Sequence, residues 1–115
     1  MHMRIFLALI FVAATAQGTV SFDQVRSIVD ASCVTCHKGE QGGGGLRLDS
    51  AAGIARVVVP GKSADSPLIQ RVTALDLRRR MPLGRPPLKP EEIAILREWI
   101  DAGAALPVWR SANHA

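Results

Sequence analysis

The sequence predicts a small domain made of short helices, on two observations. Apolar residues recur at helical spacing in stretches that begin near residues 22, 67 and 90, and each beginning carries residues that favour a helix N-terminus. Segments rich in Gly and Pro separate these stretches, which is typical of loops between helices. The run Val57-Val58-Val59, stopped by Pro60-Gly61, suggests one short extended segment.

The first helix is predicted over about residues 22–31. Ser21 and Gln24 have the Ser-x-x-Gln spacing of a capping box. Four apolar residues share one helical face, namely Phe22, Val25, Ile28 and Val29. We expect this face to belong to the core, and the helix leads directly into residues 33–37.

Two short helices are predicted in the middle of the chain. Asp49 is the expected cap of the first, which should end near Gly53. Ser66 and Pro67 suit the N-cap and first residue of the second. Its expected buried side consists of Leu68, Ile69 and Val72.

The last predicted helix begins at Pro90. Glu91 and Glu92 follow, where the helix dipole favours acidic side chains, and Gly103 suits the C-terminal cap. Its apolar face consists of Ile93, Leu96, Trp99 and Ile100.

Residues 39–45 form a glycine-rich run that cannot be regular structure. Glycine adopts positive φ without strain, so the backbone here can approach a bulky group closely. A nucleotide-binding loop would end in Gly-Lys-Ser or Gly-Lys-Thr, which this run lacks. We expect either a loop over the edge of a cofactor or a flexible surface excursion.

The motif Cys33-Val34-Thr35-Cys36-His37 carries the clearest chemistry. Cys-x-x-Cys-His is the attachment signature of c-type haem. Each thiol can add to one vinyl group of the porphyrin to form a thioether. The imidazole of His37 can then bind the iron from the proximal side.

Three other interpretations of this motif are weaker. A thioredoxin-like redox pair requires a βαβ context, whereas a helix is predicted before Cys33. A zinc site requires four ligands, and the other imidazole expected to remain after processing, His114, lies in the tail. A disulfide between Cys33 and Cys36 would leave the histidine unexplained.

Met81 is the predicted second axial ligand. Met1 and Met3 lie in a predicted export signal, so Met81 is the one methionine left in the mature chain, and it lies in a Pro/Gly-rich loop. A lone methionine often fills a core gap, but a loop position favours ligation. A thioether ligand favours ferrous iron and raises the reduction potential. His114, Lys38, Lys62 and Lys89 are the alternative ligands.

The run Arg78-Arg79-Arg80 precedes Met81, and most such runs are solvated. Alternatively, one arginine pairs with a haem propionate while the others attract an acidic redox partner.

Residues 1–16 are predicted to be a signal peptide. Arg4 supplies the positive charge, residues 5–14 are apolar, and Ala14-Thr15-Ala16 fits a cleavage site. The apolar run is shorter than the roughly 20 residues of a membrane-spanning helix, so residues 17–115 are expected to form one periplasmic or otherwise exported domain without a membrane span.

Charge and composition limit the function classes further. The formal charge of +4 falls by one on loss of Arg4, and two propionates would bring it close to neutral. Nucleic-acid binding is therefore not indicated. Since the motif uses both cysteines, none remains for a disulfide framework.

An ordered set of motifs over about residues 22–107 resembles the planctomycete-type cytochrome c domain. They are Cys33 to His37, residues 44–50, Val59-Pro60-Gly61-Lys62-Ser63, Ser66-Pro67-Leu68-Ile69, Met81-Pro82, residues 88–93 and residues 99–104. The resemblance implies an all-α cytochrome c-like fold of several short helices around one covalently bound haem. It also implies thioethers at Cys33 and Cys36, His37 as the proximal ligand and Met81 as the distal ligand.

Two positions depart from the family pattern. The family often has Met-Pro-Pro where this chain has Met81-Pro82-Leu83, and Ser or Thr where Lys89 precedes the last helix.

The expected function is electron transfer between redox proteins by a monohaem cytochrome that is not an enzyme. The alternatives are a haem enzyme or sensor with an open distal site, peroxidase-like or gas-binding, and a haem-bearing interaction module.

Overall fold

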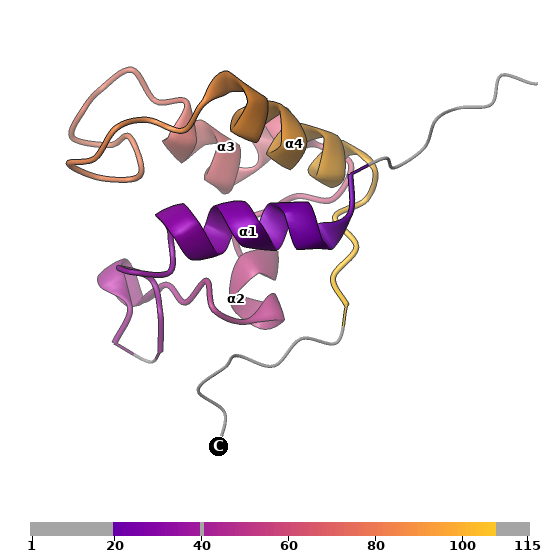
Figure 1. Cartoon of the computed structure of the whole chain (residues 1–115), viewed down its shortest axis with the longest axis horizontal. Coiled ribbons are helices and arrows are strands. Elements are labelled where there is room, and N and C mark those ends of the chain that lie inside the picture. The colour runs from indigo at the N-terminus through magenta and orange to yellow at the C-terminus, as the bar shows by residue number, and fades with distance from the viewer. Residues whose placement is uncertain (1–19, 40, 108–115) are drawn as a thin grey trace, which may run out of the picture.

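The computed structural model describes residues 20–39 and 41–107, and this part of the chain contains helices and no strand (Figure 1). The helices are α1 (Phe22–Ser32), α2 (Ala51–Ala55), α3 (Pro67–Val72) and α4 (Pro90–Asp101), with two 3₁₀ turns, η1 (Gly43–Gly45) and η2 (Ser63–Asp65). The predicted all-α fold is confirmed. The predicted signal peptide and His114 lie outside the described residues.

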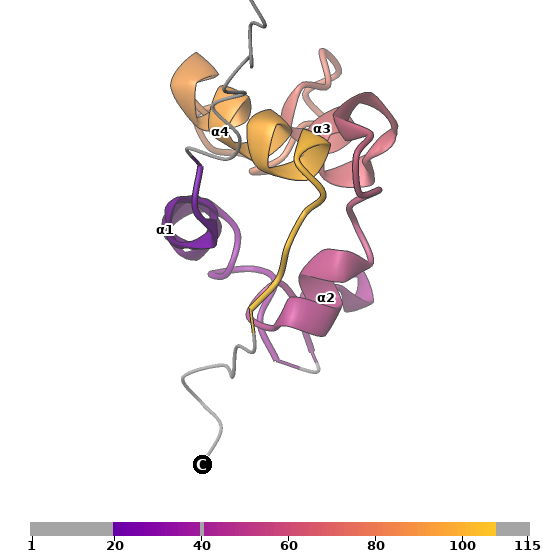
Figure 2. The same cartoon turned by 90° about the vertical axis from the view of Figure 1, so that its right-hand side faces the viewer.

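Helix α1 packs against α4, which also contacts α3 and η2. Figure 2 shows α3 and α4 together in an upper layer, with α1 and α2 apart from each other below it. The buried core joins all four helices, with Val25, Ile54, Ile69, Leu96 and Ile100 among its least exposed side chains. None of the described helices is both long and apolar enough to cross a bilayer.

Helix α1 starts as predicted and ends one residue later, at Ser32. The Ser21 backbone N–H donates to Gln24 Oε1 at 3.0 Å, so the capping box forms. Val25, Ile28 and Val29 are buried. Phe22 is half-buried against Trp99, with 5.7 Å between the ring centroids.

Helix α2 corrects the prediction in two respects. Its N-cap is Ser50, whose Oγ accepts a hydrogen bond from the Gly53 N–H at 3.1 Å. Asp49 is not the cap, because its carboxylate binds Arg47 and the Gly39 N–H instead. The helix also continues past Gly53 to Ala55.

Helix α3 begins at Pro67 with Ser66 as its N-cap, and Leu68, Ile69 and Val72 are buried, as predicted. The fully buried Ser66 hydroxyl accepts from the Val59 N–H at 2.8 Å and donates to the Lys62 carbonyl at 2.9 Å. The suggested extended segment at 57–59 therefore forms no strand, because side-chain and backbone groups at the start of α3 take up its hydrogen bonds.

Helix α4 has Pro90 as its first residue and buries Leu96, Trp99 and Ile100, as predicted. Lys89 has no acceptor to offer as an N-cap side chain, but the Glu92 carboxylate accepts from its backbone N–H at 2.9 Å. Gly103, at φ +117°, follows the end of the helix. The Trp99 indole donates to the Ala105 carbonyl at 3.1 Å, so Trp99 is part of the core.

Candidate haem site

One apolar cavity of about 590 Å³ lies between the end of α1, the glycine-rich run, α3 and the loop that connects α3 to α4. Its volume is in the range of pockets that enclose a small organic ligand. Four predicted site residues line it together, namely Cys33, Cys36, His37 and Met81. The fold thus gathers at one place side chains from two distant stretches of the sequence.

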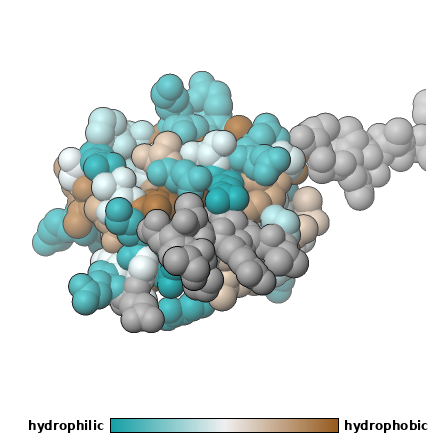
Figure 3. All heavy atoms as spheres, turned by 60° about the horizontal axis from the view of Figure 1, so that its bottom comes forward, coloured by the Kyte–Doolittle hydropathy of each residue, from teal (hydrophilic) through white to brown (hydrophobic). Residues whose placement is uncertain are grey.

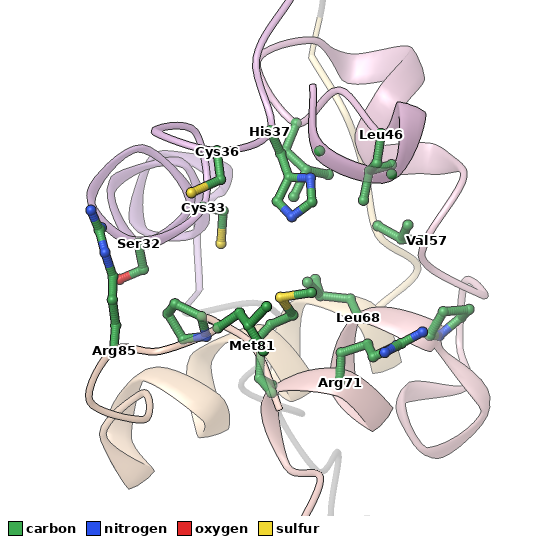
Figure 4. Close-up of a pocket in the computed structure, with 17 residues that line it drawn as sticks. Ser32, Cys33, Cys36, His37, Leu46, Val57, Leu68, Arg71, Met81 and Arg85 are labelled. Carbon is green, nitrogen blue, oxygen red and sulfur yellow. The ribbon is translucent and has the colours of Figure 1, made fainter. Parts of the chain in front are cut away.

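The two cysteines lie where α1 ends. The Cys33 N–H donates to the Val29 carbonyl at 2.9 Å, and the His37 N–H donates to the Cys33 carbonyl at 3.0 Å, so the motif makes a tight turn off the helix. Figure 4 shows both sulfurs on the same side of the cavity. Both thiols are free, with Cys33 half-buried and Cys36 exposed.

His37 points into the cavity (Figure 4). Its backbone carbonyl accepts a hydrogen bond from the Leu48 N–H at 2.7 Å, which closes residues 37–48 into a loop. Its Nδ1 atom is buried, and no hydrogen-bond partner is found for it within the described part of the chain. A buried polar atom without a partner is unusual in a folded protein and requires an explanation.

The glycine-rich run approaches His37 closely. The Gly43 N–H donates to the Cys36 carbonyl at 2.8 Å, and a Cβ at Gly43 would lie 3.5 Å from Cε1 of His37. A Cβ at Gly42 would overlap the Leu46 carbonyl oxygen, so only glycine fits there. The expectation of no regular structure is wrong at Gly43–Gly45, which make one 3₁₀ turn around Gly44 at φ +65°.

Met81 lies in the segment from 73 to 89, which we name the Met81 loop. Its side chain is half-buried and projects into the cavity from the wall opposite His37 (Figure 4). The Met81 N–H donates to the Arg71 carbonyl at 3.0 Å, which joins the loop to α3. The imidazole and the thioether thus face each other across the cavity.

Two arginines that were not predicted as site residues, Arg71 and Arg85, line the cavity. Arg78, Arg79 and Arg80 are absent from its lining, and the exposed Arg78 side chain pairs with Asp76 at 3.3 Å. Helical spacing could have identified Arg71, because it lies four residues after Pro67 on a cavity-lining face of α3. Arg85 had no such signal, because it lies in an irregular loop.

Two ionisable groups near the cavity have shifted pKa values. Burial, together with the negative charge of Glu92, raises the pKa of the Cys33 thiol to about 11. For Asp49, burial acts to raise the pKa, but hydrogen bonds from Arg47 and the Gly39 N–H, with the Arg47 charge, outweigh it and hold the pKa below its ordinary value. Asp49 is therefore a carboxylate that links the Arg47 side chain to Gly39, the first residue of the glycine-rich run.

These residues fit a haem. The cavity wall is mostly apolar, as a porphyrin plane requires, and its reactive groups are two free thiols, an imidazole and a thioether. The guanidinium groups of Arg71 and Arg85 can donate hydrogen bonds to carboxylates such as the propionates. In the described residues, no three His, Cys, Asp or Glu side chains are grouped to hold a bare metal ion.

The all-α fold and this donor set are those expected of a c-type cytochrome. Residues 33–83 match the family model described as Planctomycete cytochrome C. This part of the chain is similar to the planctomycete-type cytochrome c family, and the match supports the resemblance found in the sequence. The family implies a covalently bound haem c. No curated protein and no solved structure matches the chain.

Proposed function

We propose that the protein is an exported monohaem cytochrome that transfers electrons between redox proteins. The proposal rests on one observation: Cys33, Cys36, His37 and Met81 line a single apolar cavity, with His37 and Met81 on opposite walls. In this proposal the two cysteines hold the haem by thioethers. His37 and Met81 are the axial ligands, and the bound haem supplies the one-electron chemistry.

The chain's own residues have separate tasks in this proposal. The hydrogen bonds of the Cys36 and His37 carbonyls fix the turn that orients the imidazole. The bond between Met81 and Arg71 holds the thioether opposite it. Apolar side chains such as Leu46, Val57 and Leu68 exclude water from the space between them.

Met81 favours an electron carrier over a haem enzyme or gas sensor. Two protein ligands close both faces of the iron, whereas an enzyme or sensor needs one face open to a small molecule. We therefore propose no catalytic residue. The redox partners are proteins that approach the cavity rim. Residues 1–16 direct the chain out of the cytoplasm, and haem c is attached outside it.

The test is the spectrum of the protein expressed with haem-attachment machinery, for wild type, Met81→Leu and Leu83→Ala. Leucine retains most of the volume of Met81 and removes only the sulfur. We expect low-spin ferric iron with a sulfur-to-iron charge-transfer band in the wild type and in Leu83→Ala, a cavity-lining control from the same loop. The band should vanish in Met81→Leu.

Two results would contradict the proposal. High-spin iron in the wild type would remove Met81 from the site and favour the gas-binding or peroxidase-like alternative. Release of the haem from the wild type on denaturation would exclude thioether attachment. The variants Cys33→Ser and Cys36→Ser each remove one thioether and are the matched comparison.

A further inference from the structure

The Met81 loop exposes apolar side chains. Among the described residues, the large apolar side chains that are strongly exposed are Leu75 at 94%, Leu77 at 68% and Leu83 at 57%, and all three belong to this loop. Burying one leucine completely is worth about 1.5–3 kcal/mol. Single exposed leucines are ordinary, but several on one segment indicate an interaction site.

The same loop contains the net positive charge of the protein. Residues 73–89 include five cationic side chains and one acidic side chain, which gives a net charge of +4. The whole chain also has a net charge of +4, so the cationic and acidic residues elsewhere cancel. The pair of Arg78 and Asp76 is exposed and therefore weak.

The position of the loop relates this surface to the cavity. Figure 1 shows it projecting at the end of the molecule where α1 ends, and Leu83 and Arg85 line the cavity itself. Figure 3 shows apolar and hydrophilic side chains interspersed at that end. A partner bound to the loop would thus lie against the rim of the cavity.

We propose that the Met81 loop is the docking surface for an acidic redox protein whose contact face has carboxylates around an apolar centre. The proposal depends on the proposed electron-transfer function. The charge of +4 selects an acidic partner and disfavours a second copy of this chain, whose loop would repel it. The leucines supply the apolar contact that holds the complex once the charges have brought it together.

An electrode can stand in for such a partner. The holoprotein is adsorbed on gold coated with a carboxylate-terminated thiol monolayer, and the rate of electron exchange is measured by voltammetry at low ionic strength. Arg79→Glu should lower the rate about tenfold. Lys62→Glu makes the same charge change at an exposed residue outside the cavity wall, and it should have little effect.

The leucines are tested on a monolayer of mixed carboxylate and methyl ends. The double variant Leu75→Ser, Leu77→Ser should lower the surface coverage there several-fold and leave coverage on the pure carboxylate monolayer unchanged. Equal effects of Arg79→Glu and Lys62→Glu, or unchanged coverage by the leucine variant, would overturn the proposal.

Two controls separate this proposal from its rivals. Vesicles of phosphatidylcholine with phosphatidylglycerol test a lipid surface, and salt-resistant binding to them that requires Leu75 and Leu77 would overturn the protein-docking proposal. Oxidation of the ferrous protein by ferricyanide in solution tests electron transfer itself. If this reaction fails, the proposed function fails; if only the monolayer variants fail, the docking surface alone is wrong.

Discussion

The Met81 N–H donates a hydrogen bond to the Arg71 carbonyl at 3.0 Å, and the Arg71 side chain in turn lines the cavity that Met81 enters. The proposed distal ligand and a cationic wall residue therefore belong to one local unit. Because this bond is between backbone groups, substitution of either side chain should leave it intact.

Arg71 is expected to raise the reduction potential of the bound haem. The propionates of haem lie on the edge opposite its vinyl groups, and Arg71 lies away from the two cysteines in the cavity (Figure 4). Arg71→Gln removes a positive charge from the cavity wall. The loss of this charge stabilises the ferric state, which is the more positive of the two oxidation states. The potential should fall by an amount on the order of tens of mV at low salt, measured by redox titration.

Lys62→Gln is the control for this charge, because Lys62 lies outside the cavity wall. An unchanged potential in Arg71→Gln would show that Arg71 does not interact with the haem or its propionates.

In the haem-free protein, Cys36 should be alkylated before Cys33. The thiolate is the reactive form, and a pKa of about 11 for Cys33 leaves roughly one thiolate in a thousand at pH 8. The reaction at Cys33 should therefore accelerate about tenfold for each pH unit up to its pKa. Iodoacetamide labelling, followed by mass spectrometry of the peptides, measures both rates.

Glu92→Gln tests the electrostatic part of this effect. Glutamine retains an oxygen that can accept the Lys89 N–H but removes the charge that helps to raise the pKa of Cys33. Labelling of Cys33 should become faster, and the rate at Cys36 serves as the internal reference. Slower labelling of Cys33 would contradict this account.

Asp49→Asn should destabilise the domain by about 1–3 kcal/mol at neutral pH, the usual cost of a lost charged hydrogen bond. The folded pKa of Asp49 is below its ordinary value of 3.8. Its carboxylate therefore contributes stability above that value, which is lost as the pH falls through the folded pKa. Urea unfolding at several pH values should show the wild type and variant converging in acid. A constant difference at all pH values would mean that the charge of Asp49 is unimportant.

Gly53→Ala should destabilise the fold, although alanine usually favours a helix by roughly 1 kcal/mol over glycine. A Cβ at Gly53 would overlap the Arg47 carbonyl oxygen, so backbone must move. Ala52→Gly, at an exposed position of the same helix, is the matched control and should cost at most about 1 kcal/mol. Thermal unfolding measures both, and a stabilised Gly53→Ala would contradict the close approach.

Local patterns were sufficient to predict much of this molecule. Capping residues and apolar spacing located α1, α3 and α4 within one or two residues, because helix ends depend on groups three or four residues apart. The spacing of Cys33, Cys36 and His37 predicted a haem site in the same way, since the chemistry of that motif lies within five residues. The assignment of these residues and Met81 as haem ligands stays a prediction.

Contacts between distant residues account for what local patterns did not predict. Asp49 is not the predicted helix cap, because its carboxylate binds Arg47 and the Gly39 N–H instead. Arg71 and Arg85 reach the cavity only because α3 and the Met81 loop fold over the end of α1. Such contacts form when helices pack and bury their apolar faces together. The spacing of residues along the chain does not indicate which loops will then be neighbours.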